Sequence, residues 1–144
     1  LHIPLIIYAP AWNKRKVIEE QVELMSIAPT IADILGLSGE KKHFMGKSLV
    51  PLIEDTENGS EYVVSEASRS KISYREPEWK CIFDCENGKI ELYNLQNDPK
   101  EKENIAQKEK EKVREFRQKL LKYKKLVEKE RIKRRIKNSF SKRI

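Results

Sequence analysis

The sequence has few of the residues that build disulfide frameworks, metal centres and catalytic sites. Among its 144 residues there are only two histidines and two cysteines. On one strand, Cys81 and Cys85 would face the same way about 13 Å apart, at roughly 3.3 Å per residue, which is too far for a disulfide between them. Without a further cysteine or a nearby histidine, the pair is also a poor zinc site. We therefore expect two half-buried thiols in a reducing setting, which slightly favours the cytoplasm.

Long hydrophobic runs are absent too. No segment approaches the roughly 20 apolar residues that a membrane-spanning helix needs, and we find no internal repeat. No signal peptide is visible, but the chain opens at Leu1 inside an apolar stretch. We therefore expect this chain to be a piece of a longer protein.

The charge of the chain is unevenly distributed. The formal net charge is +7, but Lys108–Ile144 has 17 Lys and Arg against 5 Asp and Glu, a net charge of +12. In Leu1–Gln107 the numbers are 13 and 18, a net charge of −5. The basic character therefore belongs to the tail, and the body is mildly acidic.

The first third of the sequence predicts one strand and one helix. The apolar run Leu1–Pro10 is typical of an interior strand of a parallel sheet, buried on both faces. A helix is expected within Gln21–Leu37, with Ser26 as its N-cap and Pro29 in its first turn. Gly36 is placed to end this helix. Its apolar stripe, which should pack on a sheet, consists of Ile27, Ile31, Ile34 and Leu35.

The middle of the sequence predicts a small antiparallel sheet, because short β-rich segments alternate with turn signals. The four expected strands are Tyr62–Ser65, Ile72–Tyr74, Trp79–Phe83 and Ile90–Tyr93. Asn87 followed by Gly88 is a strong hairpin signal. Asp98 and Pro99 have the pattern of an N-cap and a first helical residue, so we expect a brief helical turn after the last strand.

The sequence from Lys108 onward predicts a long helix. Its apolar residues recur at alternating steps of three and four, which is typical of one packing seam. They are Val113, Phe116, Leu120, Tyr123 and Val127. After Val127 the phase changes, and apolar residues recur every fourth position among Lys and Arg: Ile132, Ile136, Phe140 and Ile144. The seam is short for a coiled coil, so we expect it to pack on the chain's own sheet rather than on another subunit.

Four segments, taken in order, resemble the C-terminal portion of sulfatases of the alkaline-phosphatase superfamily. Residues 2–10, His-Ile-Pro-Leu-Ile-Ile-Tyr-Ala-Pro, are similar to the family's V-P-L-I-I-x-x-P strand. Residues 22–37 are similar to its V-x-x-x-D-I-x-P-T…L-x-G helix. Residues 46–52, which look like a turn leading into a short helix, are similar to G-x-S-L-x-P-L. Residues 91–106 match E-L-Y-D-L-x-x-D-P-x-E-x-x-N-L-A closely, and residues 79–82 resemble the W-K-Y-I strand before it.

The resemblance covers about residues 1–126 and does not include the basic tail. Two positions depart from the family's pattern. Ser26 stands where the helix usually has Asp, and Asn94 replaces the common Asp of L-Y-D-L. Ser and Asp can both cap a helix, so the role of the first position survives, and the second exchange is also mild.

The resemblance implies chemistry that this chain does not carry. In the family, the nucleophile is a formylglycine made from Cys or Ser in a C/S-x-P-x-R motif, and carboxylates with an Asn or His bind a divalent cation, usually calcium. The sequence contains neither that motif nor an Asp-His pair. We therefore assign no catalytic, cofactor-binding or metal-binding residue to this chain. Calcium and formylglycine are expected in the complete enzyme, and the isolated chain is expected to be inactive.

Other candidate residues have a simpler interpretation. His2 lies beside the strand that follows the metal-ligand segment in the family, and His43 lies in a loop close to lysines. We interpret both as packing or exposed residues rather than ligands. Basic and aromatic residues of the small C-terminal domain could hold an anionic substrate, because that domain can line the cleft in the family. These residues are Arg69, Lys71, Arg75 and Trp79. A solvated sheet face is the simpler explanation, and we do not assign them as sites.

The sequence as a whole indicates the C-terminal part of a sulfatase-type hydrolase that cleaves sulfate esters. In it, this segment would complete the fold and shape the substrate cleft. The expected partners are the rest of the sulfatase chain and an anionic small-molecule substrate, with no clear nucleic-acid partner. Two alternatives stay open: a module that binds a polyanion or a membrane surface through the basic C-terminal helix, and a phosphoester or phosphonate hydrolase.

The expected fold is α+β. Residues 1–55 would be the end of a large alkaline-phosphatase-like α/β domain, residues 56–107 a small four-stranded antiparallel sheet, and residues 108–144 a basic C-terminal helix.

Overall fold

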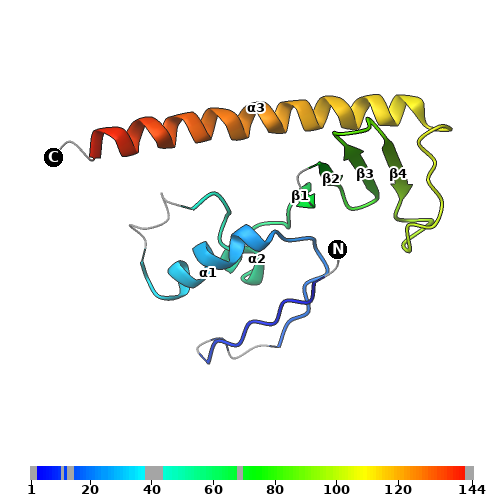
Figure 1. Ribbon diagram of the computed structural model, residues 1–144. Coiled ribbons are helices and arrows are strands. Elements are labelled where there is room, and N and C mark those ends of the chain that lie inside the picture. The colour runs from blue at the N-terminus through cyan, green and yellow to red at the C-terminus, as the bar shows by residue number, and fades with distance from the viewer. Residues whose placement is uncertain (1–2, 11, 13–14, 38–43, 68–69, 142–144) are drawn as a thin grey trace. The chain divides into compact units, whose positions relative to one another are not determined.

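A computed structural model describes residues 3–10, 12, 15–37, 44–67 and 70–141, with residues 134–141 described by their backbone alone (Figure 1). The chain divides into two compact units, Leu1–Gly59 and Ser60–Ile144, called unit 1 and unit 2 below. Unit 1 contains short helices and extended segments, and unit 2 contains a sheet and a long helix.

The predicted first strand does not form among the described residues. Residues 3–9 have no regular secondary structure, and Ile6 in their middle is 90 % exposed. A parallel strand exists only beside hydrogen-bonded neighbours. Every strand of the described residues belongs to the sheet of unit 2, so this segment has no such neighbour, and the prediction was wrong for this chain.

The predicted helix in unit 1 is confirmed, and it begins with a 3₁₀ turn. The turn η1 covers Leu24–Ser26 and runs directly into α1, Ile27–Ile34. Ser26 holds the N-cap position, but its side chain makes no capping hydrogen bond, which corrects the predicted role. The preceding turn satisfies one of the open N–H groups at the start of α1, because the Ile27 N–H donates to the Leu24 carbonyl. Gly36, with φ +69°, ends the helix as predicted.

The apolar stripe of α1 faces the opposite way from the prediction. Its residues Ile31, Ile34 and Leu35 are exposed. The buried residues of this helix are the small or polar ones: Pro29, Thr30 and Ala32. Helical periodicity identified the residues that share a face, but the neighbour that would cover this face is absent from the described residues.

The second helix of unit 1, α2, covers Val50–Ile53. Its last carbonyl groups accept hydrogen bonds from the Lys16 ammonium, which lies 3.0 Å from both the Leu52 and the Ile53 oxygens. The same ammonium pairs with Asp55 at 2.5 Å. A side chain from the segment before η1 thus satisfies the open end of α2.

Unit 2 contains the predicted four-stranded antiparallel sheet, in the order β1-β2-β3-β4. The strands are β1 Val63–Ala67, β2 Lys71–Arg75, β3 Trp79–Asp84 and β4 Ile90–Asn94. The turn between β3 and β4 contains Asn87 and Gly88, as predicted, and Gly88 has φ +68°. The Asp84 carboxylate accepts hydrogen bonds from the backbone of Glu86 and the amide of Asn87, which fixes the turn.

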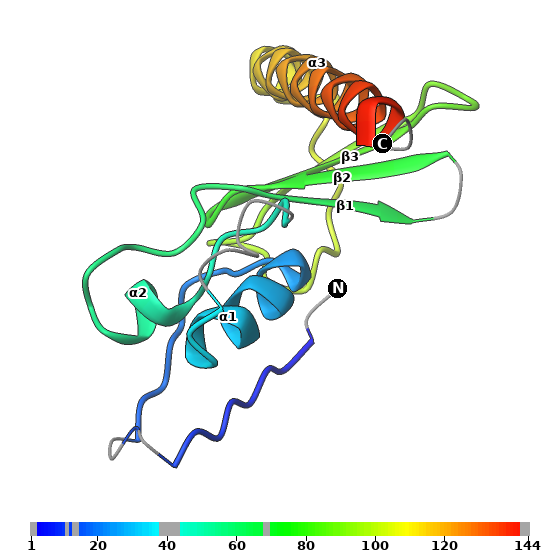
Figure 2. The same cartoon turned by 90° about the vertical axis from the view of Figure 1, so that its left-hand side faces the viewer.

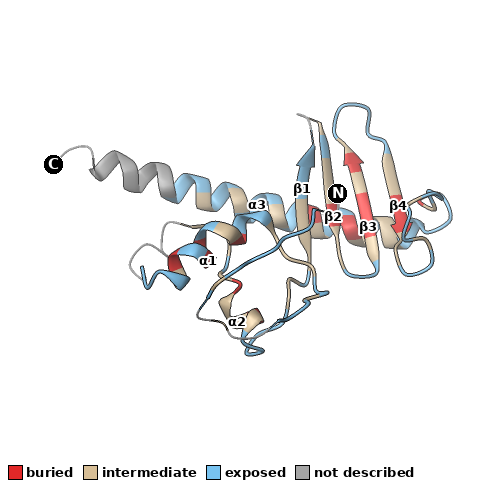
Figure 3. Ribbon diagram, turned by 90° about the horizontal axis from the view of Figure 1, so that it is seen from below, coloured by how far each residue is buried: buried red, intermediate tan, exposed pale blue. Residues whose placement is uncertain are grey.

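The long helix α3, Lys110–Ser141, lies along one face of this sheet (Figure 2). The core between them consists of Tyr74, Cys81, Phe83, Leu92, Ala106, Phe116 and Leu120. The buried segments of β2, β3 and β4 are coloured red in Figure 3. Tyr74 packs edge-on against Phe116, with ring centroids 5.7 Å apart, and stacks on Tyr62 at 4.8 Å. The seam therefore packs on the chain's own sheet, as predicted.

The contact between α3 and the core ends before the helix does. Among the helix residues with described side chains, which end at Lys133, Tyr123 is the last one packed against the core cluster, and the helix continues to Ser141. The sequence pattern changes phase after Val127, close to this point. The periodicity of the seam thus marks the length of helix that the sheet supports.

Candidate functional site

In the segment that most closely resembles sulfatases, side chains after β4 accept hydrogen bonds from backbone N–H groups and so fix the turns. Asn94, the exchanged position, uses its side-chain oxygen to accept hydrogen bonds from the N–H groups of Gln96 and Asn97, each at 3.1 Å. The Asp98 carboxylate accepts from the N–H groups of Lys102 and Glu103, at 2.7 and 2.9 Å. An Asp at position 94 could accept in the same way, so the exchange is structurally mild.

The Asp98-Pro99 pair does not open a helix, in contrast to the prediction. The Glu101 N–H donates to the Asp98 carbonyl, which closes a tight turn, and Glu101 has φ +54°. This left-handed conformation interrupts a helix, because residues of L chirality adopt it singly. It belongs to the residue whose carboxylate lies 2.5 Å from the ammonium of the buried Lys80 on β3.

The Lys80–Glu101 pair thus joins two of the segments that carried the resemblance. A buried ammonium without a partner is strongly unfavourable, so Glu101 is required wherever Lys80 is buried. Beside it, the Tyr93 hydroxyl donates to the Glu91 carboxylate at 2.8 Å. Burial and this hydrogen bond raise the pKa of Tyr93 to about 12. These groups hold the turn on the sheet, and none of them is arranged as a nucleophile with a base.

Asn104 seals the outer edge of β4. Its side-chain oxygen accepts from the N–H groups of Leu92 and Ala106, both at 3.0 Å, and its amide donates to the Ile90 carbonyl at 3.4 Å. The Ile105 N–H then donates to the Leu92 carbonyl at 3.0 Å. The asparagine and alanine of the motif are therefore explained by strand pairing and core packing.

The second and third family-like segments meet inside unit 1. The hydroxyl of the buried Thr30 donates to the Ser26 carbonyl at 2.5 Å and accepts from the Leu49 N–H at 2.8 Å. Gly46 lies against the backbone of η1, where an added Cβ would collide with the Met25 carbonyl group. The Pro-Thr and Gly-x-Ser-Leu patterns are therefore explained by one close contact between two backbone segments, bridged by the Thr30 hydroxyl.

The two cysteines occupy different environments, rather than the two half-buried ones expected. Cys81 lies in the core, and burial raises the pKa of its thiol to about 12. Such a thiol is protonated and inert at neutral pH. Cys85 follows the end of β3 and is exposed, with its sulfur 3.8 Å from the Lys124 ammonium.

The candidate anion-binding residues do not gather into one site. Trp79 points toward α3, where the Lys112 ammonium lies 5.3 Å from its ring centroid. Lys71 and Arg75 alternate with the inward-facing Ile72 and Tyr74, so they lie on the sheet face away from α3. Trp79 thus faces away from the two cations. Arg69, His2 and His43 lie outside the described residues.

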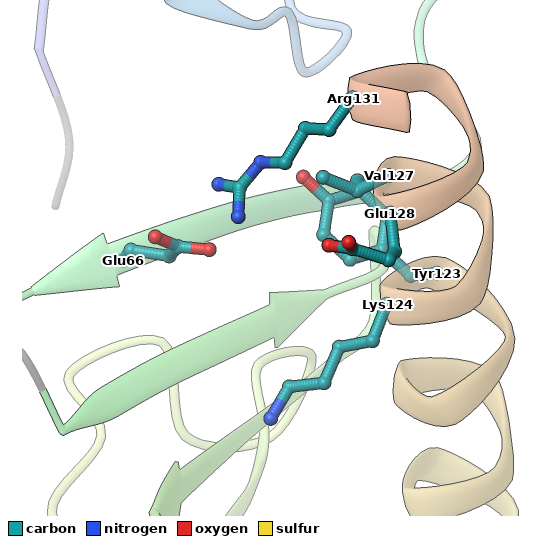
Figure 4. Close-up of a pocket in the computed structure, with 6 residues that line it drawn as sticks. All are labelled: Glu66, Tyr123, Lys124, Val127, Glu128 and Arg131. Atoms are coloured by element: carbon teal, nitrogen blue, oxygen red, sulfur yellow. The ribbon is translucent and has the colours of Figure 1, made fainter. Parts of the chain in front are cut away.

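A shallow hollow of about 320 Å³ lies between β1 and the middle of α3 (Figure 4). It is lined by Glu66, Tyr123, Lys124, Val127, Glu128 and Arg131. Two cations and two carboxylates give it no net charge, and it contains no cysteine, serine or histidine. The hollow has the composition of a solvated surface rather than of a catalytic site.

An ion-pair network joins α3 to the turn between β2 and β3. The Lys119 ammonium lies 2.5 Å from the carboxylates of both Glu76 and Glu115. Burial opposes the charge of Lys119, but hydrogen bonds to Glu115 and Glu76 outweigh it and raise the pKa of this lysine. Hydrogen bonds from Lys119 and Lys112 lower the pKa of Glu115. The network fixes the position of the helix over the sheet.

Within the described parts of the chain, no three His, Cys, Asp or Glu residues are grouped so that they could hold a metal ion. None of the helices that the structure describes is both long and apolar enough to cross a membrane.

Comparison with known proteins decides the family. A sequence model described as "N-sulphoglucosamine sulphohydrolase, C-terminal" matches residues 1–131. The chain belongs to this sulfatase family. The resemblance found in the four segments is thereby confirmed, and the match also takes in most of the long helix.

Named sulfatases in two vertebrates are similar to this chain. Arylsulfatase K of Xenopus laevis is 29% identical over 135 residues, covering 83% of this chain and 25% of that protein. Arylsulfatase K of Danio rerio is 32% identical over 117 residues, covering 73% of this chain and 22% of that protein. The chain thus spans about a quarter of the length of the curated relatives it matches.

Solved sulfatase structures share the fold. A structure described as a 2-O GAG sulfatase superposes with a TM-score of 0.55 at 29% identity, over 68% of this chain and 23% of that one. A putative sulfatase from Bacteroides thetaiotaomicron gives the same values. The predicted α+β fold class and its relation to sulfatases are confirmed.

Sequence reasoning identified the family segments but not the contacts within this sulfatase domain. The pairing of Lys80 with Glu101 and the bridge from Thr30 to Leu49 were not foreseen. All of these residues lie inside the segments quoted for the resemblance. The signal was present as residue identity, but the partners are about 20 positions apart and cannot be read from local pattern.

Proposed function

We propose that the complete protein containing this chain is a sulfatase that hydrolyses sulfate esters of sugars. The observation that supports this most strongly is the match of the family model to residues 1–131. The family is described by an N-sulphoglucosamine sulphohydrolase, which acts on a sulfated sugar through an N–S bond, and one similar structure is described as a 2-O GAG sulfatase, which points to the ester class. A sulfated sugar is therefore the substrate class that we assign.

The chemical groups of the reaction are proposed to lie outside this chain. Formylglycine needs a Cys or Ser in a C/S-x-P-x-R motif, which the sequence lacks, and its buried Cys81 is held as a neutral thiol. A calcium ion prefers six to eight oxygen ligands, and the described residues offer no cluster of three acidic or histidine side chains. The residues present therefore fit neither formylglycine nor calcium.

The role that we propose for this chain is to complete the fold and to form one wall of the substrate cleft. Unit 1 supports this through its uncovered apolar side chains: Ile6, Tyr8, Val17, Leu24 and Leu35 are all more than 60 % exposed. Burial of each such side chain stabilises a folded protein by about 1.5–3 kcal/mol. We propose that the rest of the sulfatase chain covers this surface, with residues 1–55 forming the end of a large α/β domain.

The proposal is tested with the complete protein and two small substrates, an aryl sulfate and the matching aryl phosphate. We expect release of the phenol from the sulfate, loss of this activity with a strong calcium chelator, and no activity from residues 1–144 alone. Faster hydrolysis of the phosphate would instead support a phosphoester hydrolase. Failure to hydrolyse either ester under conditions in which the protein is folded would reject the proposal.

The covering of unit 1 is tested by Ile31→Gln in the complete protein, compared with Leu121→Gln on the outer face of α3. Both side chains are 53 % exposed in this structure. If the rest of the chain covers α1, Ile31→Gln should lower the unfolding temperature clearly more than Leu121→Gln. Equal small shifts would mean that the stripe of α1 stays in solvent.

A further inference from the structure

We propose that the basic end of the chain, Arg131–Ile144, is a docking site for a sulfated polysaccharide. This inference rests on the proposed function, because the proposed ligand is a polymeric form of the substrate class assigned above. It goes beyond the family, since the family match ends at residue 131, where this segment begins.

The first observation is charge. The segment contains seven Lys and Arg residues and no Asp or Glu: Arg131, Lys133, Arg134, Arg135, Lys137, Lys142 and Arg143. Subtracting them from the totals leaves 23 Lys and Arg and 23 Asp and Glu in residues 1–130. The last 14 residues therefore carry the whole formal net charge of +7, and residues 1–130 carry no net charge.

The second observation is placement. Residues 131–141 belong to α3 but lie beyond Tyr123, the last helix residue with a described side chain that packs against the core. Arg131, Ile132 and Lys133 are exposed. A rise of about 1.5 Å per residue gives the helical part of this segment a length of roughly 16 Å. The backbone of α3 thus continues into a segment rich in Lys and Arg, past the last described side chain that packs on the sheet.

The third observation is that cations near the core have acidic partners. Lys112 and Lys119 pair with Glu115, and Lys119 also pairs with Glu76. In the basic end, Lys133 pairs with Glu130 at 2.7 Å, and Arg131 lines the hollow that contains Glu66 and Glu128. The sequence offers no acidic residue after Glu130. On a helix, Glu130 is the i,i+4 neighbour of Arg134, so the cations from position 135 onward are those with no acidic residue three or four positions away.

A linear polyanion is the ligand that this arrangement fits. Closely spaced cations displace the counterions condensed on such a polymer, and the released ions drive binding. Lysine and arginine both contact sulfate oxygens, and arginine does so with two parallel hydrogen bonds. A polysaccharide held here would raise the local concentration of its sulfate groups around the enzyme.

A sulfated polysaccharide is favoured over an anionic membrane or a nucleic acid. Only four of the 14 residues are apolar: Ile132, Ile136, Phe140 and Ile144. An interfacial membrane helix needs a larger apolar face to insert. The aromatic residues that stack on bases are represented by Phe140 alone. The substrate class of the family supplies sulfate groups directly.

The test uses the complete protein and fluorescently labelled heparin as the probe, with binding measured by anisotropy at several salt concentrations. The variant replaces Lys133, Arg134, Arg135 and Lys137 with Gln, which removes four charges while keeping good helix formers. The matched control replaces four exposed lysines outside the basic end with Gln: Lys47, Lys100, Lys102 and Lys110. Both variants therefore have the same net charge.

The variant of the basic end should bind heparin about 100-fold more weakly at low salt. The slope of the logarithm of its binding constant against the logarithm of the salt concentration should fall in magnitude by about 3. The control should change the affinity by less than about threefold. Equal weakening of both variants would overturn the proposal, because net charge alone would then explain the binding. Tighter binding to duplex DNA, or to phosphatidylserine-containing vesicles, than to heparin would overturn the assignment to a polysaccharide.

The same two variants separate this inference from the proposed function. Hydrolysis of the small aryl sulfate should be unchanged in the variant of the basic end, whereas KM for a sulfated polysaccharide should rise about tenfold or more. Aryl sulfate hydrolysis without heparin binding would reject the docking site alone. Heparin binding without any sulfate hydrolysis would reject the proposed function and leave the docking site standing.

Discussion

Unit 1 and unit 2 are stabilised in different ways. In unit 2, Leu92 and Phe116 are 0 % exposed and join the sheet and α3 into one core. In unit 1, Ile6 is 90 % exposed, while the buried residues of α1 and its N-cap are Ser26, Pro29, Thr30 and Ala32. One unit is thus built on a cluster of large apolar side chains, whereas the other combines close backbone contacts with two buried leucines, Leu49 and Leu52.

The difference shows which part of this sulfatase domain contains its own folding determinants. Burial of apolar surface is the main favourable term in folding, and unit 2 achieves it within residues 60–144. Unit 1 leaves much of its apolar surface in solvent, so its contacts alone provide less stabilisation. Four substitutions can break or sharpen this comparison, and hydrogen–deuterium exchange can follow each unit separately.

The largest effect is expected for Phe116→Ala. It removes the ring that contacts Tyr74 and the ammonium of Lys119, and it leaves a cavity in the core of unit 2. The free energy of unfolding of unit 2 should fall by about 3–5 kcal/mol. Exchange should accelerate in peptides from β3, β4 and α3 together. Leu121→Ala, on the exposed face of the same helix, should change it by less than about 0.5 kcal/mol.

The next effect is expected for Gly46→Ala in unit 1. The new methyl group would overlap the Met25 carbonyl, which cannot move without shifting η1, so we expect a loss of about 1–3 kcal/mol. Exchange should accelerate in peptides from α1 and α2, with β3 and β4 unchanged. Gly36→Ala is the control, because position 36 has open space but φ +69°, and its cost should be about 1 kcal/mol. A smaller loss for Gly46→Ala than for this control would contradict the steric explanation.

Thr30→Val should cost about 1–3 kcal/mol. Valine keeps the shape of the side chain but leaves the Leu49 N–H buried without an acceptor. Thr30→Ser retains the hydroxyl and should be the milder change, even though it removes a methyl group. If both variants lose the same stability, packing rather than the hydrogen bond joins α1 to α2.

The smallest effect concerns pH and the ion pairs under α3. The pKa of Glu115 is lowered in the folded protein, so its contribution to stability is present above the unfolded-state pKa near 4.5 and is lost as the pH falls through the folded pKa. The carboxylate is partly exposed and screened, which limits the contribution to about 0.5–1 kcal/mol. The free energy of unfolding, measured by urea denaturation, should therefore fall less steeply between pH 7 and pH 3 in Glu115→Gln than in the unchanged protein. Identical slopes would show that the pair adds nothing.

Local patterns in the sequence were sufficient to predict the sheet and the long helix of unit 2, but not the turn at Asp98 between them. Alternation with period two and the Asn87-Gly88 turn specify the four strands, because each strand pairs with its neighbour in sequence. The seam from Val113 to Val127 predicted the packing of α3, which the structure shows as far as Tyr123. Such contacts need only short loops to form.

The predictions for unit 1 failed where the partner is distant. The apolar segment Leu1–Pro10 was typical of a strand, but a strand needs neighbours that the described residues do not supply. The stripe of α1 was identified as one face, yet nothing in its periodicity says what covers that face. In the candidate site, the left-handed Glu101 that pairs with Lys80 was missed, because a non-glycine residue with positive φ has no sequence signature.

The seal that Asn104 places on β4 has a consequence for how this domain behaves when crowded. A row of open backbone groups on an outer strand can recruit a strand from another molecule and start fibril growth. Along β4, Asn104, Ile105 and Asp98 already pair with the Leu92 N–H and with the carbonyls of Ile90, Leu92 and Asn94. A strand from another copy would have to displace these hydrogen bonds first, so the outer edge of β4 resists strand addition without needing a lysine or a proline there.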